Sequence, residues 1–140
     1  MSCITHARYK LRVQEGPNLQ KTAARMSKIT ISTHILDTSR GLAADNVPVT
    51  LYKLQETTNE WRKISQSATN DDGRCPELII AEEFEPGYYK LNFDTSDYFK
   101  RYHTRYLYPF VEIVFECGSK QHYHIPLLLN PFGYSTYRGT

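Results

Sequence analysis

The sequence has little cysteine and almost no net charge. There are three cysteines, Cys3, Cys75 and Cys117, so they cannot all pair within the chain. Their spacing matches neither a disulfide framework nor a zinc site. We interpret them as reduced thiols of an intracellular protein. Seventeen Lys and Arg residues against fifteen Asp and Glu leave a formal charge of +2, which argues against nucleic acid or an anionic membrane as a partner.

Several familiar motifs are also missing. No apolar run is long enough to span a bilayer, and residues 7–20 contain too many charged side chains to form the apolar core of a secretory signal. The sequence has no Gly-rich phosphate loop, no nucleophile elbow and no metalloprotease-type helix motif. We therefore expect a protein that is neither secreted nor membrane-bound. If it is an enzyme, its chemistry uses groups outside these three motifs.

What is present is enough hydrophobic sequence for one core and an unusual amount of tyrosine. Hydrophobic residues make up 40% of the 140 residues, which suits a single domain. The eleven tyrosines favour half-buried β-structure and association between subunits. Residues 1–27 show neither strand nor helix periodicity, so we predict that they form an extension, disordered or targeting, and that the domain occupies 28–140.

Alternating apolar and polar residues dominate the rest of the chain. Asn70–Gly73 is a strong turn signal, and Asp94–Asp97 is predicted to cap one short helix that runs towards Tyr102. The segments with strand spacing are 29–34, 47–52, 61–69, 88–93, 110–115, 121–129 and 134–137. Short strands separated by turns are typical of an antiparallel β-sandwich, here of seven to eight strands with one helix. The aromatic segment Tyr106–Phe115 is predicted to be an edge that a second copy covers.

Histidine is the candidate chemical residue. His34 ends the first strand on the face opposite its isoleucines, and His122 and His124 are two apart, so they share a face. Arg74 follows the Asn70–Gly73 turn. A single histidine on a strand is ordinarily a surface residue or a core residue with its hydrogen bonds satisfied. Three of them together with an arginine fit a functional site as well as they fit this structural role.

The chemistry expected of these groups is water activation by imidazole. A neutral histidine, with an unperturbed pKa of ~6.5, accepts a proton at physiological pH. Three histidines can also hold a catalytic zinc with water in the open position. Their spacing is unspecific, however, and no acidic partner stands near them in the sequence, so we predict neither a metal nor a cofactor.

Four pieces of the sequence, taken in order, resemble the transthyretin-like family. They are Thr33–Asp37, Thr69–Arg74, Tyr108–Glu112 and His122–Leu129. The ending Tyr-Arg-Gly-Thr, at 137–140, is similar to the terminal Tyr-Arg-Gly-Ser signature of the family's enzyme branch, which hydrolyses 5-hydroxyisourate. The resemblance covers about 28–140. The last residue departs from the signature, because Thr140 keeps the hydroxyl of serine and adds a methyl group.

The resemblance implies a fold, a reaction and an assembly. The fold is the transthyretin-like β-sandwich, assembled as a homotetramer around a central channel. The implied reaction, part of urate degradation, is hydrolysis of 5-hydroxyisourate to 2-oxo-4-hydroxy-4-carboxy-5-ureidoimidazoline without a cofactor. The implied location is peroxisomal or cytosolic. Two alternatives are weighed beside it: a small-ligand carrier that uses the same channel, and a plain interaction module.

The resemblance also implies a set of site residues. The catalytic groups are His34, Arg74, His124 and Thr140. Substrate binding falls to His34 and Arg74 together with three tail residues: Tyr137, Arg138 and Gly139. In this scheme the histidines orient and deprotonate water, Arg74 matches the urea-like atoms of the substrate, and the tail folds back to complete the site.

Overall fold

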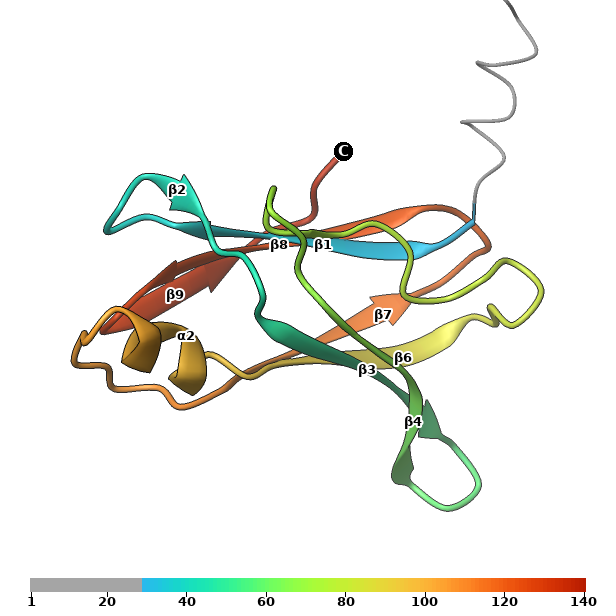
Figure 1. Cartoon of the computed structure of the whole chain (residues 1–140). Coiled ribbons are helices and arrows are strands. Elements are labelled where there is room, and N and C mark those ends of the chain that lie inside the picture. The colour runs from blue at the N-terminus through green and yellow to red at the C-terminus, as the bar shows by residue number, and fades with distance from the viewer. Residues whose placement is uncertain (1–28) are drawn as a thin grey trace, which may run out of the picture.

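Two β-sheets packed face to face form the computed structural model, which describes residues 29–140 (Figure 1). The first sheet has the order β2-β1-β8-β9, with β5 also paired to β1, and the second has the order β4-β3-β6-β7. The strands of the first sheet are β1 (Ile31–Asp37), β2 (Leu42–Ala43), β5 (Arg74–Cys75), β8 (Tyr123–Asn130) and β9 (Gly133–Thr136). Those of the second are β3 (Pro48–Gln55), β4 (Glu60–Ala68), β6 (Gly87–Phe93) and β7 (Val111–Cys117), and the described helix is α2 (Ser96–Arg101).

The predicted sandwich of short strands with one short helix is confirmed. The pairing is antiparallel with one exception, because β1 and β8 run parallel, from Ile31 opposite Tyr123 to Asp37 opposite Leu129. The two-residue strands β2 and β5 lie outside the segments predicted as strands, and β5 directly follows the Asn70–Gly73 turn. The predicted extension at 1–27 lies outside the described residues, so the predicted domain boundary stays a prediction.

The core lies between the two sheets, as the alternating pattern requires. In β6, Tyr89, Leu91 and Phe93 are fully buried, whereas the residues between them are not. The Phe84 ring stacks on Tyr89 of one sheet and Tyr123 of the other, with ring centroids 5.7 and 6.1 Å apart. Burying such a side chain stabilises the fold by roughly 1.5–3 kcal/mol, so these rings hold the two layers together.

Asp37, at the end of β1, anchors the helix to the first sheet. Its buried carboxylate accepts hydrogen bonds from the Tyr98 hydroxyl of α2, at 2.6 Å, and from the backbone and hydroxyl of Ser39. Burial, followed by the hydrogen bond to Asp37, raises the pKa of Tyr98. The predicted helix cap is only partly right: Thr95 is the N-cap residue, but its hydroxyl donates to the Tyr108 carbonyl and makes no cap hydrogen bond.

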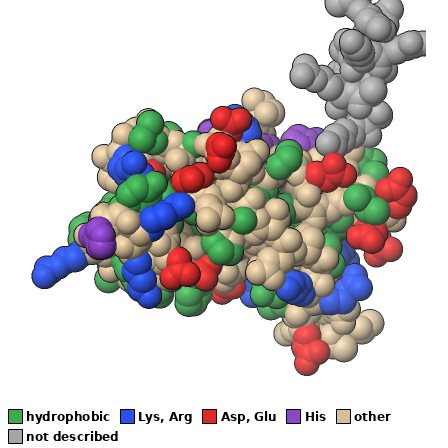
Figure 2. All heavy atoms as spheres, in the orientation of Figure 1, with side chains coloured by type: hydrophobic (Ala, Val, Ile, Leu, Met, Phe, Trp, Pro, Cys, Tyr) green, Lys and Arg blue, Asp and Glu red, His purple; other side chains and the backbone are tan. Residues whose placement is uncertain are grey.

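Acidic and basic side chains are intermixed on the face of the sandwich that Figure 2 shows. Within residues 29–140, no helix combines the length and the apolar character needed to cross a bilayer. The chain's end rises from the outer side of the sheet that contains β1 and β8 (Figure 1). That outer side, away from the core, carries the polar residues considered next.

Candidate functional site

Three strands of the first sheet bring the polar side chains together. In the register of the sheet, His124 of β8 lies opposite Ser32 of β1, and Arg74 of β5 lies opposite His34 of β1. Residues opposite one another on neighbouring strands share a face of the sheet, and Ser32 and His34 are two apart on β1. The pairing therefore puts two histidines, a serine and an arginine on one face.

The Asn70–Gly73 turn fixes the position of Arg74, the residue that follows it. The Asn70 side-chain oxygen accepts the backbone N–H groups of Asp72 and Arg74, both at 3.0 Å. Gly73 has a φ of +72°, and a Cβ atom there would run into the Ile35 carbonyl oxygen. Because the Ile35 N–H donates to the Gly73 carbonyl at 2.8 Å, the turn lies directly against β1.

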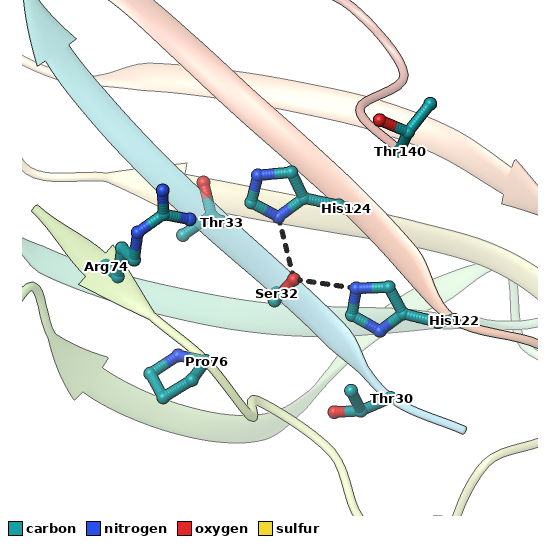
Figure 3. Close-up of a pocket in the computed structure, with 8 residues that line it drawn as sticks. All are labelled: Thr30, Ser32, Thr33, Arg74, Pro76, His122, His124 and Thr140. Atoms are coloured by element: carbon teal, nitrogen blue, oxygen red, sulfur yellow. Dashed lines mark hydrogen bonds between the residues drawn. The ribbon is translucent and has the colours of Figure 1, made fainter. Parts of the chain in front are cut away.

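A cavity of about 330 Å³ opens on this face (Figure 3). Its walls come from β1, β5 and β8, from the residues before β1 and β8, from the residue after β5, and from the end of the chain. They are Thr30, Ser32, Thr33, Arg74, Pro76, His122, His124 and Thr140. Polar groups from four separated stretches of sequence thus converge on one space, the usual form of a small-molecule site.

Ser32 connects two imidazoles in this cavity. Its hydroxyl lies 2.8 Å from Nδ1 of His124 and 3.2 Å from Nε2 of His122, and the two rings are nearly parallel with centroids 6.3 Å apart. The prediction that His122 and His124 share a face is confirmed. The hydrogen bond to Ser32 occupies one nitrogen of His124, and the other, Nε2, points away from Ser32 (Figure 3).

Burial and the Arg74 charge favour the neutral form of both histidines of the predicted catalytic set. Burial, then the Arg74 charge, then His122 and His34 lower the pKa of His124 below 6.5. Burial and Arg74 likewise lower the pKa of His34, and Asp72 opposes them in part. A neutral imidazole beside a guanidinium provides a proton acceptor and a fixed positive charge in the same space.

The chain's end packs against His124. The Gly139 N–H donates to the His124 carbonyl oxygen at 2.8 Å, which makes an isolated antiparallel bridge between the two residues. A Cβ atom at 139 would collide with the His124 ring. Only glycine lets the tail pass this close, and the next residue, Thr140, then lines the cavity.

Not all of the predicted site residues line this cavity. Arg74, His124 and Thr140 line the cavity, Gly139 abuts it, and His34 stands close enough to lower the His124 pKa. The side chains of Tyr137 and Arg138 instead border a second hollow of about 320 Å³, beside β7. The Arg138 guanidinium lies 4.9 Å from the centroid of the Tyr123 ring.

Several lining residues are not among the predicted site residues, and neither is His122. Ser32 had a usable signal, because it lies two residues before His34 on the same strand face. Thr30, four residues before His34, had the same signal, whereas Thr33 and Pro76 had none. Among residues 29–140, no group of three or more His, Cys, Asp and Glu side chains is arranged to hold a metal ion.

Comparisons with known proteins identify the family of the chain. A model described as the HIUase/Transthyretin family matches residues 31–139. The chain belongs to this family. Its curated relatives include the 5-hydroxyisourate hydrolase of Mus musculus, 43% identical over 111 residues that cover 79% of this chain and 94% of the mouse protein. That of Mesorhizobium japonicum is 40% identical over 115 residues, which cover 79% of this chain and 91% of the bacterial protein.

Solved structures of the HIUase/Transthyretin family share the fold. The 5-hydroxyisourate hydrolase of Klebsiella pneumoniae aligns with a TM-score of 0.69 at 35% identity. The alignment covers 82% of this chain and 100% of the Klebsiella chain. Transthyretin of Sparus aurata aligns with a TM-score of 0.74 at 27% identity, over 79% of this chain and 97% of that one. The predicted transthyretin-like fold and family are confirmed, and the fold is common to proteins named as enzymes and to proteins named as transthyretins.

Proposed function

We propose that this chain hydrolyses 5-hydroxyisourate to 2-oxo-4-hydroxy-4-carboxy-5-ureidoimidazoline, a step of urate degradation. One observation carries the proposal: the cavity on β1 places a neutral imidazole, an arginine and the terminal hydroxyl together. The relatives named 5-hydroxyisourate hydrolase, at 34–43% identity, support the choice of substrate.

In the proposed mechanism, His124 is the general base. Its Nε2 takes a proton from a water molecule that attacks the C6 carbonyl carbon. His124 then returns this proton to N1 as the N1–C6 bond breaks, which leaves the hydroxyl on C6 and opens the six-membered ring. Arg74 presents planar N–H donors to the carbonyl oxygen as negative charge develops on it. The reaction involves no change of oxidation state, so the proposal requires no cofactor.

The other proposed residues act around this centre. His34 helps to orient the water, and the Thr140 hydroxyl holds water or substrate on the side of the cavity away from Arg74 (Figure 3). Gly139 allows the tail to reach that position. The substrate-binding roles of Tyr137 and Arg138 rest on the family resemblance alone, because both side chains line the second hollow.

The proposal includes an assembly and a location. We propose a homotetramer, built through exposed hydrophobic residues on the edge strands, among them Val114 of β7 and Tyr134 of β9. Placement in the peroxisome or the cytosol rests on the resemblance alone.

A small-ligand carrier is the competing function in this family. One solved relative, sea bream transthyretin, was determined in complex with thyroxine and is 28% identical. The imidazoles and Arg74 bring hydrogen-bonding and charged groups to the cavity here, which favours hydrolysis. The test is to generate 5-hydroxyisourate with urate oxidase and to follow its absorbance with and without this protein. We expect substoichiometric protein to speed the loss, whereas a carrier would leave the rate unchanged.

A further inference from the structure

The Ser32 hydroxyl stands between two ring nitrogens but has a single proton to donate. Nδ1 of His124 lies 2.8 Å from its oxygen and Nε2 of His122 lies 3.2 Å away (Figure 3). A hydroxyl can accept hydrogen bonds while it donates one. One imidazole must therefore donate to Ser32 if the other accepts from it, so the protonation of the two neutral rings is linked.

Two arrangements satisfy both contacts. In the first, Ser32 donates to Nδ1 of His124, whose own proton is then on Nε2, and His122 donates to Ser32. In the second, Nδ1–H of His124 donates to Ser32, and Ser32 donates to Nε2 of His122. The hydrogen bond made by one ring nitrogen decides which nitrogen of that ring carries the proton.

We propose that Ser32 and His122 are positioning residues that hold His124 in its Nδ1–H form, the second arrangement. This inference rests on the proposed function, because a base that acts through Nε2 needs its lone pair on that atom. In the second arrangement Nε2 of His124 is unprotonated and points away from Ser32 (Figure 3). In the first arrangement Nε2 already carries a proton, and His124 cannot accept another there.

Proton uptake also favours the second arrangement. A doubly protonated imidazole donates from both nitrogens. The bond from Nδ1–H of His124 to Ser32 then persists while Nε2 receives the proton from water, so no group has to rotate during the reaction. In the first arrangement a proton could enter only at Nδ1, where it would displace the hydrogen that Ser32 donates to that atom.

The burial of Ser32 gives the link its strength. Ser32 is only 6% exposed, so the direction of its hydroxyl is set chiefly by its protein neighbours. His122 is an exposed residue directly before β8, and it acts through Ser32 by accepting the hydrogen of the Ser32 hydroxyl. If that acceptor is removed, the Ser32 hydroxyl turns to Nδ1 of His124 and drives the His124 proton to Nε2.

The experiment records nitrogen-15 chemical shifts of the histidine rings in the full chain without substrate, at about pH 8, where imidazoles are neutral. We expect His124 and His122 both to carry their proton on Nδ1. Two exposed-site variants form a matched pair: His122→Gln offers an amide oxygen to Ser32 and should keep His124 in the Nδ1–H form, whereas His122→Phe should move the proton to Nε2.

Turnover is measured on the same samples. Ser32→Ala and His122→Phe should lower kcat by roughly 10- to 100-fold with little change in KM, since a positioned base contributes ~10²–10⁴-fold. Ser32→Thr, which keeps the hydroxyl, should recover most of that loss. Melting temperatures confirm that each variant is folded.

An Nε2–H signal for His124 in the unmodified protein would overturn the proposal, as would an unchanged His124 spectrum together with full kcat in a folded Ser32→Ala variant. The spectra need no substrate, so they judge the proton placement even if the proposed reaction fails. Absence of wild-type turnover, with Nδ1–H observed, would contradict the proposed function and leave the hydrogen-bond assignment standing.

Discussion

Two imidazoles with lowered pKa values determine the chemistry that the cavity offers. Burial and the Arg74 charge disfavour the protonated forms of His34 and His124 in the folded chain. Because the folded pKa lies below the unfolded value of 6.5, protonation favours the unfolded state, and these residues cost stability as pH falls below 6.5. Above it they are neutral bases.

The first prediction follows from this sign. The acid limb of kcat/KM against pH should have its midpoint below 6.5, the ordinary histidine pKa. Arg74→Gln removes the charge that lowers the His124 pKa, so the residual activity should show a limb moved up towards 6.5. Arg74→Lys keeps the charge and should leave the limb near its original position. A wild-type limb above 6.5, or no difference between the two variants, would contradict this electrostatic account.

The second prediction concerns the contact between the tail and His124. Gly139→Ala puts a methyl group into the His124 ring, so the tail or the ring must move. Since misplacement of a catalytic group by about 1 Å can cost ~100-fold in rate, we expect kcat to fall by about that factor with little loss of melting temperature. Gly118→Ala is the matched control, because a Cβ atom there meets nothing within 4 Å. Equal turnover in the two variants would show that the tail does not position the base.

Among the structural elements, the Asn70–Gly73 turn links backbone conformation to the site. The third prediction is that Gly73→Ala lowers the free energy of unfolding by more than about 1 kcal/mol and also slows turnover, because the turn must leave the Ile35 carbonyl and takes Arg74 with it. Gly41→Ala shares a positive φ, +67°, but meets no atom within 4 Å, so it should carry the conformational cost alone. Denaturant unfolding and kcat on both variants provide the measurement. Equal losses in both variants would show that contact with β1 adds nothing.

Strands such as β6 could be predicted because fully buried residues alternate along them with less buried ones. Tyr89, Leu91 and Phe93 alternate in sequence and are all fully buried in the structure. Periodicity does not state the direction of a neighbour, however, so the parallel pairing of β1 with β8 could not be read from it. Strands of two residues, such as β5, are too short to show any period.

The site residues could be predicted only in part, because the sequence pattern does not show which side chains neighbouring strands bring together. His34, Arg74 and His124 carry groups whose chemistry is visible in any sequence, whereas Ser32 gains its place only when β8 puts His124 beside it. Past the last strand no alternation sets the direction of a side chain. Arg138 therefore packs over Tyr123, away from the cavity that its position in the terminal signature suggested.

The complete sandwich leaves hydrophobic side chains on two edge strands. Val114 of β7 is 58% exposed, and Tyr134 of β9 is 43% exposed. The aromatic segment Tyr106–Phe115 leads into β7, which is the edge of its sheet, as the sequence predicted. Exposed apolar edges are covered by association in many β-proteins.

The fourth prediction is that four chains of 16.3 kDa associate at micromolar concentration. Val114→Lys, which places a charge on the β7 edge, should yield smaller species. Ala68→Lys introduces the same charge on the exposed end of the opposite edge strand, β4, and should leave the assembly intact. Light scattering of the three proteins decides it; a monomeric wild-type chain would refute the proposed tetramer.

The measurement that bears most directly on the cavity as the hydrolytic site compares wild type with His124→Ala. Both proteins are added at the same concentration to 5-hydroxyisourate freshly formed by urate oxidase, after matched melting temperatures and oligomeric states show that both are folded. With the proposed base removed, the variant should lose at least about 100-fold in kcat, the lower range for a general base. Substrate loss at the full wild-type rate in the folded variant would contradict the account.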